Sequence, residues 1–142
     1  MKHLKIFEEY YNNELRKEYD YGNVSASIKN DLYEVADIIN RYGDSEIILT
    51  VLNEEYSNEL FPVSILENIN IKESYRNIGN GKKLYYEYEN WAKINNCQYS
   101  LLVSDKEEKQ LDDFNLDNWY KSLGYVKIGN ISNNSVMIKD LI

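Results

Sequence analysis

The stretch from Ile65 to Trp91 constrains the fold more than any other part of the sequence. It begins with a run typical of a β-strand, Ile65 to Ile71, and continues through a short connector into a loop with two glycines, Gly79 and Gly81. The apolar residues that follow fall on one face of a 3.6-residue period, which predicts a helix; they are Leu84, Tyr88, Trp91 and Ala92. The pattern therefore predicts a strand, a glycine loop and a helix in that order.

A glycine loop at the start of a helix is a candidate anion site. Backbone N–H groups there have no intrahelical partner, and the helix dipole adds about half a positive charge at that end. Gly79 and Gly81 lack the Cβ atoms that would hold the backbone away from a phosphate. The spacing excludes a Walker loop and gives a poor dinucleotide fingerprint. A helix start with permissive glycines and no ligand is the alternative interpretation.

Composition narrows the class of protein. With 142 residues, 43% of them hydrophobic and 13% aromatic, the chain predicts one globular domain. The net charge of −8 argues against non-specific binding to a nucleic-acid backbone. The sequence shows no membrane span and no signal-peptide core, and the single cysteine, Cys97, fits a reducing compartment. We therefore expect a cytoplasmic protein that binds neither nucleic acid nor membrane.

Hydrophobic periodicity predicts the elements that precede the central stretch. Spacings of three and four predict an amphipathic helix, and alternation or an apolar β-branched run predicts a strand. The expected order is a helix over 3–19, a strand over 24–28, a helix from a cap at Asn30 or Asp31 to Tyr42, a central strand over 46–52 and an acidic turn or loop over 53–59.

The elements after the central stretch are expected to close on a hairpin. A buried strand over 99–103 leads into a charged loop over 104–113, which we interpret as solvated. Asn115 or Asp117 could cap a short helix that carries Trp119, Tyr120 and Leu123 and ends at Gly124. Two final strands, 125–128 and 136–142, are joined by a turn rich in Asn and Ser.

Three motifs in this order resemble those of one family. Arg76-x-x-Gly79-x-Gly81 after a strand resembles the acyl-CoA pyrophosphate loop of the Gcn5-related N-acetyltransferase family. The segment 118–125 resembles the family's Phe-Tyr-x-x-x-Gly-Phe segment, and 136–139 resembles its last strand. Together they cover about the C-terminal two thirds of the chain. The sequence departs from the family at Glu73, where a proline is usual, and in a longer, more acidic loop after Val103.

The resemblance implies a fold, a donor and a binding site. The implied fold is a mixed, mostly antiparallel central sheet flanked by helices, with residues 1–142 as one acetyltransferase domain. The implied acyl donor is acetyl-CoA, with its pyrophosphate on the amide protons of 77–82 and its pantetheine arm along a splayed strand edge. The cofactor-binding residues are then Asn70, Ile71, Arg76, Asn77, Ile78, Gly79, Asn80, Gly81, Lys82 and Asn115, and no metal is implied.

The resemblance also implies catalytic roles. Tyr120 matches the general acid that protonates the departing thiolate, and its position four residues before Gly124 favours this role over the alternative, one of the 14 tyrosines that only pack. Our candidate for the base is Glu67, expected on the same strand face as Ile65, Ile69 and Ile71, where apolar surroundings would raise its pKa. An exposed strand glutamate is the alternative, and the other candidate bases are Glu54, Glu55 and Glu59. Cys97 has no histidine near it in sequence and is interpreted as a small buried residue.

The sequence thus predicts an acetyl-CoA-dependent N-acetyltransferase that acts by direct transfer in a ternary complex. The expected acceptor is a cationic primary amine, either a small molecule such as a polyamine or a basic protein segment, because acidic loops over 53–59 and 104–113 would wall the acceptor side. The acceptor's identity and a homodimer stay open. A catalytically idle member of the fold that binds a partner protein or CoA is the alternative.

Overall fold

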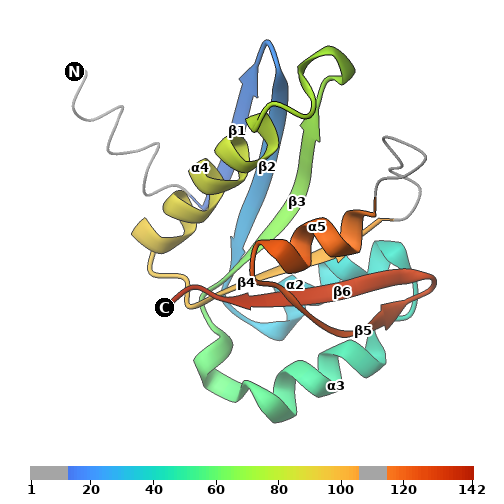
Figure 1. Cartoon of the computed structure of the whole chain (residues 1–142). Coiled ribbons are helices and arrows are strands. Elements are labelled where there is room, and N and C mark those ends of the chain that lie inside the picture. The colour runs from blue at the N-terminus through green and yellow to red at the C-terminus, as the bar shows by residue number, and fades with distance from the viewer. Residues whose placement is uncertain (1–12, 106–114) are drawn as a thin grey trace.

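The computed structural model describes residues 13–105 and 115–142, which build a six-stranded sheet in the order β1-β2-β3-β4-β6-β5. Only β3 and β4 run parallel, and the other four neighbouring pairs are antiparallel. This confirms the expected fold class, a mixed and mostly antiparallel sheet flanked by helices (Figure 1). The strands are β1 Glu14–Tyr19, β2 Gly22–Lys29, β3 Val63–Ile71, β4 Tyr99–Ser104, β5 Val126–Ile131 and β6 Asn134–Asp140.

Helices cover both faces of the sheet. The α-helices are α2 Leu32–Ile39, α3 Glu46–Glu55, α4 Asn80–Ile94 and α5 Leu116–Ser122, with 3-10 turns η1 Asn40–Tyr42, η2 Ser57–Leu60 and η3 Glu73–Tyr75. One buried apolar cluster joins α4 and α5 to the sheet, and a second joins α2 and α3 to its other face. We call these the α4 face and the α2–α3 face. None of the helices in the described part of the chain is long and apolar enough to span a membrane.

The start of the described chain corrects the expected helix over 3–19. Residues 14–19 form β1, which pairs with β2 in a hairpin, and residues 1–12 lie outside the described part. Leu15 is buried while Glu14 and Arg16 are exposed, the alternation of a half-buried strand. The four-residue spacing of Leu15 and Tyr19 misled because four is a multiple of two, so it fits one side of a strand as well as a helix face.

The expected central strand over 46–52 is also wrong, because this segment is α3. Ile48 and Leu52, four residues apart, are buried on the α2–α3 face, whereas Ile47 is 74% exposed. The Asp44 carboxylate accepts a hydrogen bond from the Glu46 backbone N–H at 3.0 Å and satisfies one amide of the first turn. The β-branched run thus lies in a helix whose tertiary contacts outweigh its strand propensity.

The expected acidic loop over 53–59 is replaced by the end of α3 and by η2. This segment runs directly into β3 and therefore lies at the end where β3 begins (Figure 1). Several other expectations hold: Asp31 caps α2, Asn115 caps α5, and the strands 24–28 and 99–103 fall within β2 and β4. The charged loop lies largely outside the described residues, since 106–114 are not described.

Candidate functional site

The two parallel strands at the centre of the sheet pair along only part of their length. The register joins β3 to β4 at four positions, from Val63 opposite Tyr99 to Leu66 opposite Leu102. Beyond Leu66, β3 continues to Ile71 beside β2, while β4 continues beside β6. Figure 1 shows the two strands diverging. We call 63–66 the paired end of β3 and 67–71 its splayed end, whose edge towards β4 has no neighbouring strand within the described part of the chain.

The splayed end starts with a β-bulge at Glu67. Ser25 pairs with Asn68 and Ala26 pairs with Leu66, so Glu67 is the extra residue between two register pairs. The bulge changes which face the following side chains meet. Ile65 belongs to the α2–α3 face, whereas Ile69 and Ile71 belong to the α4 face. The expected common face for Ile65, Glu67, Ile69 and Ile71 is therefore wrong, because simple alternation does not cross a bulge.

The side chain of Glu67 contacts an arginine from the α2–α3 face. Arg41, in η1, donates a hydrogen bond from Nη2 to Glu67 Oε1 at 3.3 Å. The side chains are 49% exposed for Arg41 and 24% exposed for Glu67. Glu67 is thus a half-buried, ion-paired carboxylate at the point where β3 and β4 part, and its surroundings are less apolar than expected.

The glycine loop links the splayed end to the start of α4. Gly79 is the N-cap with φ +86°, and Asn77 before it has φ +66°. The first hydrogen bond of the helix runs from the Lys83 N–H to the Gly79 carbonyl at 3.1 Å. The N–H groups of Asn80, Gly81 and Lys82 therefore precede the first intrahelical bond and point out of the helix end, as an anion site requires.

Polar side chains hold this loop against the end of β3. Arg76 Nε donates to the Ile71 carbonyl at 2.7 Å, and Asn80 Nδ2 donates to the Tyr75 carbonyl at 2.9 Å. The Lys83 ammonium lies 5.6 Å from the centre of the Tyr21 ring, in the turn between β1 and β2. These contacts therefore hold the loop that ends at Lys82 close to the end of β3 at Asn70 and Ile71.

The two glycines serve different purposes. A Cβ at Gly79 would meet no atom within 4 Å, but the positive φ disfavours any other residue there. A Cβ at Gly81 would lie 3.2 Å from Cζ2 of Trp119, in α5. A side chain at Gly81 would therefore press on the Trp119 ring.

α5 brings the remaining two candidate residues to the α4 face. Tyr120 is buried, with its ring centre 5.2 Å from that of Trp119 and 5.7 Å from that of Tyr125. Asn115 uses its side chain to accept the Asn118 N–H at 3.1 Å, which caps the helix. The packing role that the sequence left open for Tyr120 is therefore real, and it leaves a catalytic role for the hydroxyl untested.

A buried network of hydroxyl groups lies at the paired end, and no motif in the sequence indicated it. The Tyr88 hydroxyl is 2.8 Å from Ser64 Oγ and 2.5 Å from Ser100 Oγ. Ser100 Oγ in turn lies 2.7 Å from the Tyr125 hydroxyl, whose oxygen is hydrogen-bonded to that of Tyr85 at 3.0 Å. Burial raises the pKa of all three tyrosines well above the usual value, so each stays protonated at neutral pH.

Two further groups beside this network are inert or structural. Burial raises the pKa of the Cys97 thiol to about 11, although Ser64 lowers it, so the thiol is protonated at neutral pH and is no nucleophile. The Glu89 carboxylate accepts hydrogen bonds from Lys139 and from Tyr85. Burial alone would raise the pKa of Glu89, but the hydrogen bond and charge of Lys139 outweigh it and lower that pKa.

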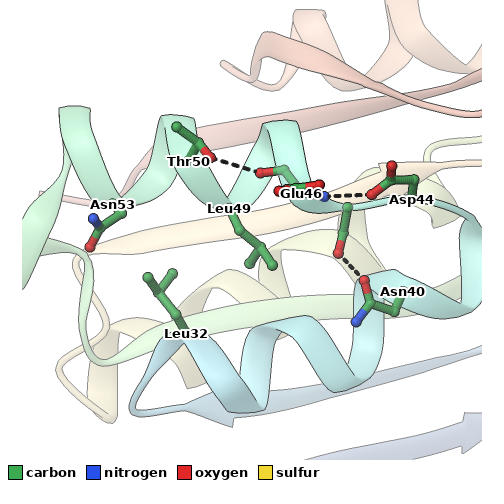
Figure 2. A pocket seen from close by; sticks show the side chains of 8 residues that line it. Leu32, Asn40, Asp44, Glu46, Leu49, Thr50 and Asn53 are labelled. Carbon is green, nitrogen blue, oxygen red and sulfur yellow. Dashed lines mark hydrogen bonds between the residues drawn. The ribbon is translucent and has the colours of Figure 1, made fainter.

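An open pocket of about 520 Å³ lies between α2 and α3 (Figure 2). The side chains that line it come from α2, α3 and the turn between them: Leu32, Asn40, Asp44, Ser45, Glu46, Leu49, Thr50 and Asn53. Asp44 and Thr50 already bond to backbone atoms of Glu46. No lining residue belongs to β3, β4 or α4, so this pocket is separate from the splayed end. Among the described residues, no cluster of His, Cys, Asp and Glu could hold a metal ion.

Comparison with known proteins bears on the fold. No protein-family model matches the chain, and no curated protein matches its sequence. Solved structures do match. FeeM, an N-acyl amino acid synthase from uncultured soil microbes, has a TM-score of 0.59 at 11% identity, over 99% of this chain and 74% of its own.

Two further structures match along most of the chain. An acetyltransferase from Streptococcus agalactiae has a TM-score of 0.54 at 13% identity, over 98% of this chain and 75% of its own. A GNAT family acetyltransferase from Elizabethkingia anophelis, solved with acetyl-CoA bound, has a TM-score of 0.54 at 9% identity, over 96% of this chain and 82% of its own. The sheet order, the splayed parallel pair, the glycine-capped helix and these likenesses agree: the chain has the fold of the Gcn5-related N-acetyltransferases.

Proposed function

We propose that the protein is an acyl-CoA-dependent N-acyltransferase that transfers an acetyl group from acetyl-CoA to a primary amine. One observation carries this proposal: the splayed end of β3 leads directly into a helix N-terminus capped by Gly79. An exposed strand edge can pair with the amide groups of an extended chain, and outward N–H groups of a helix start can bind phosphate. Acyl-CoA carries an amide-containing pantetheine arm and a pyrophosphate, which match these two features in order along the chain.

The donor would be held almost entirely by backbone atoms. The N–H groups of Asn80, Gly81 and Lys82 would bind the pyrophosphate, with Gly79 leaving open space beside them. The β3 edge at Asn70 and Ile71 would pair with the pantetheine amides. Arg76, which already holds the Ile71 carbonyl, would order the junction of the two subsites and add a positive charge near the phosphates.

The reaction needs a proton acceptor before it and a proton donor at its end. A lysine-like amine with pKa near 10.4 requires about 4.6 kcal/mol to become neutral at pH 7. Glu67, directly or through a water, would take that proton, and the amine nitrogen would then form the C–N bond as the C–S bond breaks. Tyr120 would protonate the departing sulfur and would regain a proton, through water, from the nitrogen as it becomes the amide. The bulge at Glu67 presents this carboxylate where the strands part, a place at which bulges commonly aim functional side chains.

The acceptor is proposed to be a cationic amine, as the net charge of −8 favours. Of the two acidic segments expected to wall the acceptor side, 53–59 forms the end of α3 and η2 just before the paired end of β3, and most of the other lies outside the described residues. The proposal now rests on the overall charge and on Glu67. A higher ionic strength should raise the Michaelis constant for the acceptor more than that for acetyl-CoA. A neutral best substrate with rates indifferent to salt would contradict it.

A CoA-binding protein without catalytic activity is the second candidate, and the ion pair between Glu67 and Arg41 favours it, because that carboxylate already has a cationic partner. Thiol release from acetyl-CoA distinguishes the two. The assay would present a panel of polyamines, lysine peptides and neutral amino acids, with calorimetric titration of CoA in parallel. Release that depends on an amine supports the enzyme, whereas CoA binding without release supports the second candidate. No CoA binding would contradict both.

A further inference from the structure

A single hydroxyl group lies between the two strands at the paired end. Ser64 of β3 and Ser100 of β4 face each other as a register pair, and both are completely buried. The Tyr88 hydroxyl, from α4, lies within 2.8 Å of one serine Oγ and 2.5 Å of the other. The pairing of the strands ends two positions later, after Leu66 and Leu102. Tyr88 thus contacts both strands just before they diverge.

Apolar packing alone would not fix the position at which β3 and β4 diverge. Contacts between leucine side chains are non-directional, so they tolerate small shifts of one strand against the other. A hydroxyl that bonds to one atom on each strand fixes both a distance and a direction. Two opposed serines are also small enough to admit a tyrosine hydroxyl between them, where leucines, as in the pair Leu66 and Leu102, would fill the space.

The bridge is carried by the helix that also forms the anion site. Tyr88 lies seven residues after Gly81 in α4, which corresponds to about 10 Å along the helix axis. One rigid element therefore connects the outward N–H groups of its first turn to the point of divergence. The network also reaches Tyr125 through Ser100, and the Tyr125 ring packs against that of Tyr120.

We propose that Tyr88 is a positioning residue that ties β3 to β4 at Ser64 and Ser100 and thereby fixes where the strands part. We call the gap between β3 and β4 at the splayed end the slot. Its width, and its distance from the start of α4, then depend on the Tyr88 hydroxyl. The assignment of the slot to an acyl-pantetheine arm rests on the proposed function, whereas the tie between the strands does not.

The test removes the hydroxyl and keeps the ring, as Tyr88→Phe. Ser64 Oγ keeps its bond to the Tyr99 carbonyl at 3.3 Å, and Ser100 Oγ keeps Tyr125, so neither serine loses all its partners and the variant should fold. Tyr85→Phe is the matched control. It also removes one buried tyrosine hydroxyl from α4, but that hydroxyl bonds to Glu89 and Tyr125 and touches neither β3 nor β4.

Amide hydrogen exchange in the ligand-free protein tests directly whether Tyr88 holds the two strands together. The amides of residues 67–71 should exchange at least fivefold faster in Tyr88→Phe than in the wild type, and less than twofold faster in Tyr85→Phe. Urea unfolding of both variants corrects for any difference in global stability. Equal exchange in the two variants, after this correction, would overturn the proposal, whether or not the protein binds CoA.

Ligand binding then tests what the tie does for the site. CoA affinity by calorimetry should fall at least fivefold in Tyr88→Phe and less than twofold in Tyr85→Phe, and the preference for acetyl-CoA over hexanoyl-CoA should narrow only in the first. Faster exchange in Tyr88→Phe with unchanged CoA affinity would support the claim that Tyr88 ties the strands together. It would overturn the claim that this tie shapes the CoA site. A wild type that binds no CoA would instead contradict the proposed function, while the exchange result would still decide the tie.

Discussion

The two ends of the β3–β4 pair are built from different kinds of interaction. At the paired end, apolar clusters cover both faces, and the strands are joined by buried hydroxyl groups of Ser64, Ser100 and Tyr88. At the splayed end, the backbone carries the special features, a bulge at Glu67 and a left-handed Gly79. One strand can therefore be held firmly on both sides at one end and offer its edge to a ligand at the other.

The largest expected effect comes from α5, which lies beside both ends. Tyr120→Phe keeps the ring contacts with Trp119 and Tyr125 and removes only the hydroxyl. Turnover with a competent amine should fall by about 10²-fold or more, the usual scale of lost general-acid help. Steady-state kinetics and a CoA titration would be measured together. Turnover within a factor of two of the wild type would make Tyr120 a packing residue only.

Substitution of the N-cap glycine tests the splayed end alone. Gly79→Ala places a Cβ at φ +86°, which costs about 1–2 kcal/mol in that conformation, or the loop changes conformation. Either response should weaken CoA binding by about tenfold, because the outward N–H groups lose their alignment. Gly43→Ala, at φ +139° before α3, is a control for lost stability alone, because its Cβ would lie 2.4 Å from Ser132 Oγ, away from the glycine loop. CoA affinity equal in Gly79→Ala and the wild type would remove the glycine loop from the site.

The dependence of folding stability on pH tests the paired end. Lys139 and burial have opposite effects on Glu89, and the net effect lowers its pKa, so this carboxylate stabilises the fold above its unfolded pKa of about 4.3. That stability is lost as the pH falls through the lowered folded pKa. Glu89→Gln should therefore unfold at lower urea concentration than the wild type at pH 7, and the two should converge towards pH 3. Glu18→Gln, on exposed β1, is the control, and a gap that persists at pH 3 would contradict the assignment.

The smallest expected effect concerns the ion pair at the bulge. Arg41 and Glu67 are both partly exposed, and such pairs contribute about 0–1 kcal/mol. If a cationic acceptor approaches Glu67, then Arg41→Gln should raise kcat/KM for that amine by up to about fivefold, corresponding to about 1 kcal/mol. Unfolding by urea should change little. Arg16→Gln, an exposed arginine on β1, is the matched control, and a fall in kcat/KM specific to Arg41→Gln would contradict this prediction and show that the arginine is needed to hold Glu67 in place.

The comparison also shows what the sequence could predict. The strand, glycine loop and helix from β3 to α4 were predictable because each depends on local pattern: alternation, two glycines and a 3.6-residue period. The face reversal at Glu67 was not, because a bulge is a property of the register with β2. The bridge at Tyr88 was hidden as well, since its ring fits an apolar helix face and the serine partners lie far away in sequence.

The helix expected over 3–19 and the strand expected over 46–52 were misassigned for the same physical reason. Leu15 and Tyr19 satisfy both a helix and a strand period, and the β-branched residues 46–52 favour a strand in isolation. Pairing with β2 decides the first case, and burial of Ile48 and Leu52 against the sheet decides the second. In both cases a non-local contact overrides an ambiguous local signal.

The central claim is that the splayed end and the start of α4 bind acyl-CoA. The most direct test is a titration of the isotope-labelled protein with CoA, followed through the backbone amide signals in NMR spectra. The account predicts saturable shifts concentrated in 67–71 and 77–82, with much smaller shifts in 63–66 of the same strand. No saturable shifts, or shifts concentrated on the pocket between α2 and α3, would contradict it.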